Sequence, residues 1–125
     1  MRKDLDLSGF TGTEHYYRYT RLSVLTDGTK YLADGAKCYW LMDVISSYIP
    51  TLPSDEGFAV ATLKKHKVGR GAHFELTDDI PATRYYATQE IEYTDFPFDR
   101  LGDTFKLYVE RFTDTEWCIL LTSEH

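Results

Sequence analysis

The 125-residue chain lacks several features that would place it in a class at once. It has no run of the roughly 18 to 20 apolar residues that a membrane-spanning helix needs. Its start, MRKDLDLSGF, is basic but is not followed by the apolar stretch of a secretory signal. Only two cysteines are present, Cys38 and Cys118, each among hydrophobic neighbours. We therefore expect a cytoplasmic protein with no membrane association, in which both thiols are reduced and buried.

Positive charge is also scarce. The chain has 14 Lys and Arg against 20 Asp and Glu, which gives a net charge of -6. Residues 64–74 hold 4 basic and 0 acidic residues, whereas residues 75–125 hold 4 basic and 12 acidic ones. A protein that binds DNA or RNA directly normally needs a basic face that displaces counterions from the phosphates. The charge pattern therefore argues against direct nucleic-acid binding.

The residues that are present indicate one folded domain, residues 1–125, because 42% are hydrophobic and 15% are aromatic. From Cys38 to Ile49, apolar side chains recur with helical spacing, which predicts a largely buried helix over 38–49 that is stopped by Pro50 and Pro53. Beyond residue 55 the apolar period is mostly two, and Gly69-Arg70-Gly71 marks a hairpin turn. Residues 104–112 fit both a strand and a helix, so that segment stays open.

Two local motifs predict the structure of the first third of the chain. The spacing Thr11-x-x-Glu14 matches a capping box and predicts a short helix over about 12–19. Asp27-Gly28 predicts a two-residue hairpin turn between strands, with Asp34-Gly35 ending the second strand. The expected fold is α+β: an antiparallel sheet of about five or six strands with the 38–49 helix on one face and a short N-terminal helix.

Four stretches of the chain, in order, are FTGTEHYYRY, TDGTKYLADGAKCYWLMD, IEYTDFP and ILLTSEH. Together they resemble a domain-of-unknown-function family of small bacterial, plasmid and phage proteins, over most of the chain. The chain departs from that pattern at Cys38, where alanine is usual, at Thr122, where proline is frequent, and in a more basic segment around 63–74. The resemblance implies a mobile-element setting and transfers no catalytic residue.

Carboxylates and tyrosines of the acidic half are the candidate partner-binding residues. Glu90 and Glu92 stand two apart on a predicted strand, so they would share a face at a spacing of roughly 6.6 Å. Two base-pair rises along a DNA strand come to roughly 6.8 Å, so such an edge can substitute for phosphates, although ordinary solvated faces are also acidic. Tyr and Arg are enriched at protein interfaces. The candidate set is Arg84, Tyr85, Tyr86, Glu90, Glu92, Tyr93, Asp95 and Asp99.

Other clusters carry weaker chemical signals. Cys38 with Asp34 and Asp43 lacks the nearby base and electropositive setting of a nucleophile, so we expect core structure there. The four histidines have no zinc-like spacing, and His66 and His73 would meet only across the predicted hairpin, so we expect no metal and no cofactor. The basic residues Lys64, Lys65, Lys67 and Arg70 fit protection of a sheet edge, or contact with an acidic partner or RNA.

These patterns predict a non-catalytic acidic interaction protein of a bacterial mobile element or phage. Its concrete form is an inhibitor of a host defence nuclease complex, such as a CRISPR effector, that acts by stoichiometric protein binding. The alternative is a small-ligand-binding or catalytic domain with a pocket between the 38–49 helix and the sheet, near Tyr39, Trp40 and Asp43. A homodimer formed through a strand edge is a third possibility.

Overall fold

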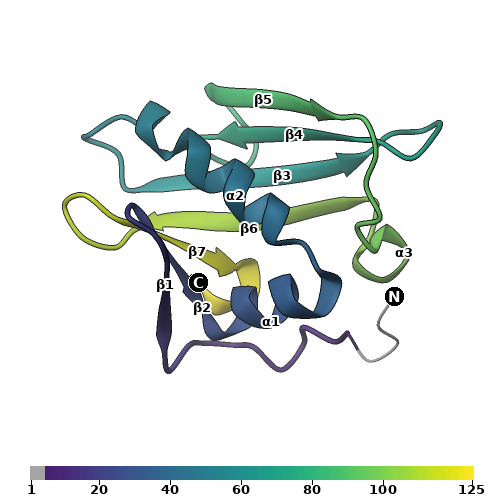
Figure 1. Ribbon diagram of the computed structural model, residues 1–125. Helices are drawn as coiled ribbons and strands as arrows, with labels where there is room; N and C mark the ends of the chain where they lie inside the picture. The colour runs from purple at the N-terminus through teal and green to yellow at the C-terminus, as the bar shows by residue number, and fades with distance from the viewer. Residues whose placement is uncertain (1–4) are drawn as a thin grey trace.

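The computed structural model describes residues 5–125 as one seven-stranded sheet with two helices laid on a single face (Figure 1). The strand order is β1-β2-β7-β6-β3-β4-β5, and every neighbouring pair is antiparallel except the parallel pair β2–β7. The predicted α+β class is confirmed, with seven strands in place of five or six. The strands are β1 (Tyr16–Thr20), β2 (Ser23–Thr26), β3 (Phe58–Lys65), β4 (Ala72–Thr77), β5 (Tyr85–Ile91), β6 (Thr104–Arg111) and β7 (Trp117–Leu121).

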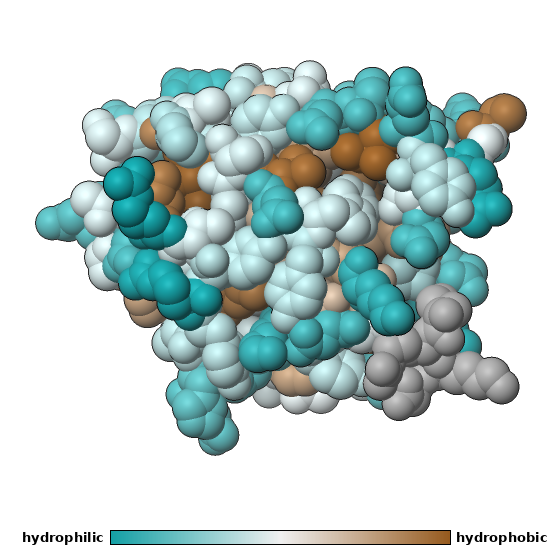
Figure 2. Space-filling model, in the orientation of Figure 1, coloured by the Kyte–Doolittle hydropathy of each residue, from teal (hydrophilic) through white to brown (hydrophobic). Residues whose placement is uncertain are grey.

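The helical elements are α1 (Asp27–Ala36), α2 (Tyr39–Tyr48) and the short α3 (Phe98–Leu101), with 3-10 turns at Ile49–Thr51 and Thr122–Glu124. The predicted helix over 38–49 is confirmed by α2 and the turn that follows it. Its inner face is buried against the sheet, with Leu41 at 2% exposure and Met42 and Ile45 at 0%. On this helix-covered side the surface is mostly polar, with apolar areas showing between the polar ones (Figure 2).

The main core lies between the two helices and the sheet. Alternate residues of the central strands point into it, as the period of two requires, and include Ala59, Ala61, Leu63, Phe74, Leu76, Leu107 and Val109. The opposite face of the sheet holds a much smaller apolar cluster of Val24, Cys118 and Leu120, with Tyr108 packed against it. The sheet is therefore covered by helices on one face only, and the polar side chains of its strands gather on the other.

The helix predicted over about 12–19 is wrong, because residues 16–20 form β1. Strand geometry places Tyr17 and Tyr19 on the same side, toward the helices, where their hydroxyls find partners. Tyr17 donates to the Asp27 carboxylate (2.9 Å), and Tyr19 donates to the Tyr39 carbonyl (3.2 Å) and to Asp43. These tertiary contacts and the pairing with β2 outweigh the local Thr11–Glu14 signal.

The hairpin predicted at Asp27-Gly28 is also wrong, because these residues open α1, and Asp34-Gly35 lies in its last turns. The turn between β1 and β2 is at residues 21–22 instead. A capping box does exist, but it joins Thr26 to Thr29. The buried Glu124 carboxylate accepts from the Thr26 hydroxyl (2.6 Å), the Gly28 amide (3.0 Å) and the Leu121 amide (2.9 Å). A methyl group on Gly28 would lie 2.6 Å from the Glu124 carboxylate, so the glycine serves close packing.

Residues 104–111 form β6, which settles the segment that fitted both a strand and a helix. This strand pairs with β3 on one side and β7 on the other. Leu107 and Val109 point into the core with exposures of 1% and 0%, and their neighbours Lys106 and Tyr108 are less buried. Pairing on both sides within the sheet makes this segment a strand, although the spacing of its aromatic residues also suits a helix.

Candidate functional site

β5 is an edge strand, because the sheet places it beside β4 and beside no other strand among residues 5–125. Where β5 ends, the chain turns along the tip of the β3–β4 hairpin and enters α3 (Figure 1). Two backbone hydrogen bonds join these segments, from the Thr94 amide to the Arg70 carbonyl (2.7 Å) and from the Lys65 amide to the Asp103 carbonyl (2.8 Å). The arrangement forms a corner of the molecule from residues far apart in the sequence.

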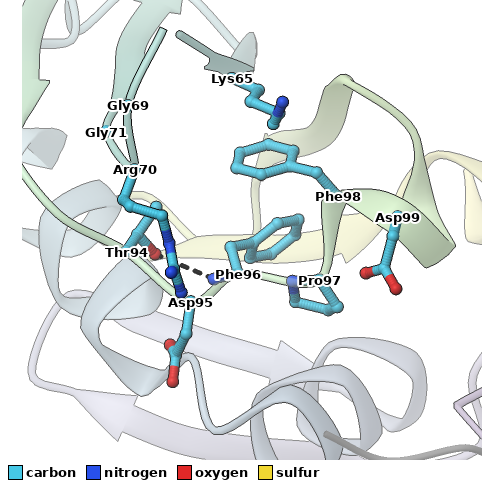
Figure 3. A pocket seen from close by; sticks show the side chains of 10 residues that line it. All are labelled: Lys65, Gly69, Arg70, Gly71, Thr94, Asp95, Phe96, Pro97, Phe98 and Asp99. Carbon is cyan, nitrogen blue, oxygen red and sulfur yellow. Dashed lines mark hydrogen bonds between the residues drawn. The ribbon is translucent and has the colours of Figure 1, made fainter.

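A cleft of about 380 Å³ opens at this corner (Figure 3). Its floor is apolar, since Phe96, Pro97 and Phe98 are buried and the rings of Phe96 and Phe98 lie 5.0 Å apart. The Phe96 ring also packs against Phe105 of β6 at 5.3 Å, which fixes the floor to the sheet. An apolar floor with a few polar or charged side chains around it is typical of small-ligand sites, whose volumes range from about 300 to 1,000 Å³.

Four charged side chains line this cleft, two of each sign. Lys65 and Arg70 come from the hairpin, and Asp95 and Asp99 from the segment after β5 (Figure 3). All four are exposed, and none of them makes an ion pair with another residue of the range 5–125 that the structure describes. The Arg70 guanidinium instead lies 5.3 Å from the centre of the Tyr93 ring. The charges of the cleft are thus available to a ligand.

A row of polar side chains crosses the adjacent part of the sheet on the face opposite the helices. Glu90 lies between two imidazoles: its Oε1 is 2.8 Å from His66 Nε2, and its Oε2 contacts His73 Nδ1. These hydrogen bonds lower the pKa of the Glu90 carboxyl. His73 Nε2 is 3.2 Å from Glu75, which in turn lies 3.5 Å from the Lys64 ammonium. Within residues 5–125, no cluster of histidine, cysteine and carboxylate side chains has the geometry to hold a metal ion.

The structure separates the predicted partner-binding residues into two groups. Tyr93, Asp95 and Asp99 lie at the cleft or beside it, together with the exposed Glu92. The residues at the start of β5 lie at its other end, where Arg84 and Tyr85 are exposed and Tyr86 is half-buried. The Tyr86 hydroxyl is enclosed without a hydrogen-bond partner among the described residues. β5 ends at Ile91, so strand geometry does not impose a shared face on Glu90 and Glu92.

Sequence reasoning did not place Lys65, Arg70 and His66 at the same corner as the segment after β5. The signal available was the Gly69-Arg70-Gly71 turn, whose register places His73 opposite Lys64 and Glu90 opposite His73. The segment after β5 could not be placed against the hairpin from local patterns. The basic hairpin and the acidic segment were therefore treated as separate surfaces, although they meet.

Groups that could act as nucleophiles are poorly set up for that chemistry. Burial raises the pKa of Cys38 and of Cys118 to about 12. A hydrogen bond to Asp34 raises the pKa of Tyr39 to about 12 as well. The interface between α2 and the sheet is filled by buried side chains, and a groove of about 330 Å³ lies beside it, lined by Thr20, Arg21, Leu22, Asp43, Ser46 and Ser47.

Among residues 5–125, no helix has both the length and the apolar character needed to span a membrane. No curated protein and no protein of known structure matches the chain. One family model matches residues 1–125, and its description is that of a family of unknown function, DUF6876. The predicted resemblance to a domain-of-unknown-function family is thereby confirmed, and the chain belongs to DUF6876.

Proposed function

We propose that the protein acts without catalysis, by stoichiometric binding to another protein through the exposed edge and end of β5. The observation that carries this proposal is the open edge strand, which is followed directly by exposed Glu92, Tyr93 and Asp95. Unpaired backbone groups on an edge, flanked by aromatic and charged side chains, offer the hydrogen bonds and the desolvated anchors that protein partners use.

The side chains of this surface favour recognition. Tyr85 and Tyr93 have 58% and 65% of their surface exposed, which is much for large amphipathic rings. Such rings bury a large area at a small cost in conformational entropy when a partner covers them. Neither Glu92 nor Asp95 makes a hydrogen bond or ion pair through its side chain to another residue in the described part of the chain. Their charges therefore remain free for cationic groups of a partner.

We also propose a more specific form, in which the partner is a host defence nuclease complex such as a CRISPR effector and the protein inhibits it for a phage or another mobile element. The carboxylates Glu92, Asp95 and Asp99 would face basic residues that normally contact nucleic-acid phosphates. Glu90 contributes less to this field, because both of its oxygens already contact imidazoles. Such an interface weakens as the salt concentration rises.

Affinity recovery from the native host, followed by binding assays with the purified partner, tests the proposal. Charge reversal by Glu92→Lys should weaken binding at least about tenfold, which corresponds to about 1.4 kcal/mol. The matched control is Asp114→Lys, an exposed carboxylate in the loop between β6 and β7 at the other end of the sheet (Figure 1). Circular dichroism verifies folding of both variants. Equal binding by the two variants would refute the placement of the site.

The alternative of a pocket between α2 and the sheet has less support. Leu41, Met42 and Ile45 fill that interface, and the groove beside it contains one carboxylate, Asp43. The Tyr19 hydroxyl already donates to Asp43. Ligand chemistry is better supported at the cleft near Arg70.

A further inference from the structure

We infer that the cleft between the β3–β4 hairpin and α3 binds a small zwitterion with an apolar body, the chemistry of a free amino acid or a dipeptide. This site goes beyond the proposed protein binding and does not depend on it. Three observations carry the inference: the size of the cleft, its apolar floor and the arrangement of its charges (Figure 3).

The charges of the cleft are balanced, with two of each sign. Lys65 and Arg70 come from the hairpin, and Asp95 and Asp99 come from the segment after β5. In Figure 3 the Arg70 side chain runs toward Asp95, whereas Lys65 and Asp99 lie at other parts of the rim. Within residues 5–125 these four side chains form no ion pair, so both signs of charge are available to a ligand.

This pattern discriminates among ligand classes. A simple anion would gain from Lys65 and Arg70 but would be repelled by Asp95 and Asp99, and a simple cation would meet the reverse. A molecule with a carboxylate and an ammonium group can contact both signs of charge at once. An apolar body then rests on the floor of the cleft. The Phe96 and Phe98 residues are only 5% and 7% exposed, so the charged contacts contribute more to affinity than this apolar contact does.

The size of the cleft limits the ligand. About 380 Å³ is near the lower end of the range of roughly 300 to 1,000 Å³ that ligand pockets span. It suits an amino acid or a dipeptide better than a nucleotide or a long peptide. A phosphate-rich ligand is further opposed by the two carboxylates.

Calorimetry and amide NMR titrations of the full chain at low ionic strength test the inference with defined probes. The zwitterions are L-phenylalanine, L-leucine and glycyl-L-phenylalanine, and the matched single-charge analogues are 3-phenylpropionate and 2-phenylethylamine. At least one zwitterion should bind about tenfold or more tightly than either analogue, with shifted amides confined to residues 65–71 and 93–99. The comparison of phenylalanine with the dipeptide decides which charge separation fits.

Two variants assign the charges. Arg70→Gln should weaken zwitterion binding about tenfold and should not weaken 2-phenylethylamine binding, because it removes a positive charge that repels this amine. Asp95→Asn should weaken zwitterion binding and should not weaken 3-phenylpropionate binding, because it removes a negative charge that repels this anion. Lys67→Gln is the control, since Lys67 is exposed on the same hairpin and does not line the cleft. If Arg70→Gln loses its fold by circular dichroism, Asp95→Asn alone carries the test.

Several outcomes would overturn the inference: no binding of any zwitterion at about 20 mM, equal affinity for a zwitterion and a single-charge analogue, or shifted amides elsewhere in the protein. Glu92→Lys, which tests the protein-binding proposal, should leave these titrations unchanged, because Glu92 does not line the cleft. The two proposals can therefore fail independently.

Discussion

Replacement of Gly28 by alanine tests the contact between the first turn of α1 and the C-terminal residues. A methyl group at this position would lie 2.6 Å from Glu124 Oε1 and 2.6 Å from Leu121 Cδ1. Both atoms are ends of side chains that can rotate in principle. Here, however, Leu121 is buried at 3% exposure, and the Glu124 carboxylate is held by three hydrogen bonds.

The expected change in the free energy of unfolding is a balance of opposite effects. Alanine is favoured over glycine in a helix by up to about 1 kcal/mol. Displacement of the carboxylate loses at least one hydrogen bond to a charged group, which costs about 1.5–3 kcal/mol. Overpacking against Leu121 costs about 1–3 kcal/mol more. We therefore expect Gly28→Ala to destabilise the protein by about 1.5–5 kcal/mol, the opposite sign to that of an ordinary glycine-to-alanine change in a helix.

Urea denaturation of four proteins measures this effect: the wild type, Gly28→Ala, Glu124→Ala and the double variant. Without the carboxylate the added methyl group breaks no such hydrogen bond, so its cost should fall by at least about 1.5 kcal/mol. Gly57→Ala is the control, because no atom lies within 4 Å of its added Cβ. Stabilisation by Gly28→Ala, or an equal cost in both backgrounds, would refute the reasoning.

Three further predictions concern other parts of the chain. Because burial raises the pKa of Cys38 and Cys118 to about 12, neither thiol should react with a disulfide reagent at pH 8 until the protein is unfolded, and fast labelling of the native protein would contradict their burial. Hydrogen bonds from Thr83 and the Arg84 amide lower the pKa of Asp78 from 3.8 to about 2, so this carboxylate stabilises the fold above pH 4 and loses that contribution between pH 4 and pH 2. Asp78→Asn should therefore lose less stability than the wild type across that interval in a urea series, and parallel curves would count against this assignment. Arg111→Lys should lower the free energy of unfolding by about 1–3 kcal/mol, measured by thermal or urea denaturation. The Arg111 guanidinium lies 4.5 Å from the Trp117 ring centre and donates hydrogen bonds to the carbonyls of Pro53, Ser54, Glu56 and Asp114. Arg21→Lys, on an exposed turn, is the control and should change the free energy of unfolding by no more than about 0.5 kcal/mol.

The elements that could be predicted from the sequence are those whose signal is local. α2 was predictable because Leu41, Met42 and Ile45 repeat at helical spacing, and the β3–β4 hairpin because glycines flank Arg70. α1 was missed because part of the reason for its start lies far away. Gly28 looks like a turn residue, but it is bonded to a carboxylate 96 residues later in the chain. Asp-Gly occurs both in hairpin turns and at helix starts. Here the local capping box between Thr26 and Thr29 and the long-range contact with Glu124 together favour the helix.

The same limit applies to the candidate site. Asp95 and Asp99 were predicted as binding residues from their charge, and the structure places both at the cleft. Lys65 and Arg70 were interpreted as edge protection, or as a contact for an acidic partner or RNA, because nothing in the local pattern shows that a hairpin tip meets the segment after β5. The contact between the hairpin tip and this segment depends on the hydrogen bond from the Thr94 amide to the Arg70 carbonyl and on the order of β3, β4 and β5 in the sheet.

The contacts at this corner also separate carboxylates that support the fold from those that can serve a ligand. Glu90 has both oxygens against imidazoles, so a substitution there removes the bridge between His66 and His73 and changes the surface and the sheet together. Glu92, one residue beyond the strand, has no such contact within residues 5–125. Loss of binding in Glu90→Lys could therefore come from the changed surface or from the changed sheet, whereas loss of binding in Glu92→Lys with the fold retained comes from the changed surface alone. For this reason Glu92 is the residue at which protein binding should be tested, and Arg70 and Asp95 are those for the cleft.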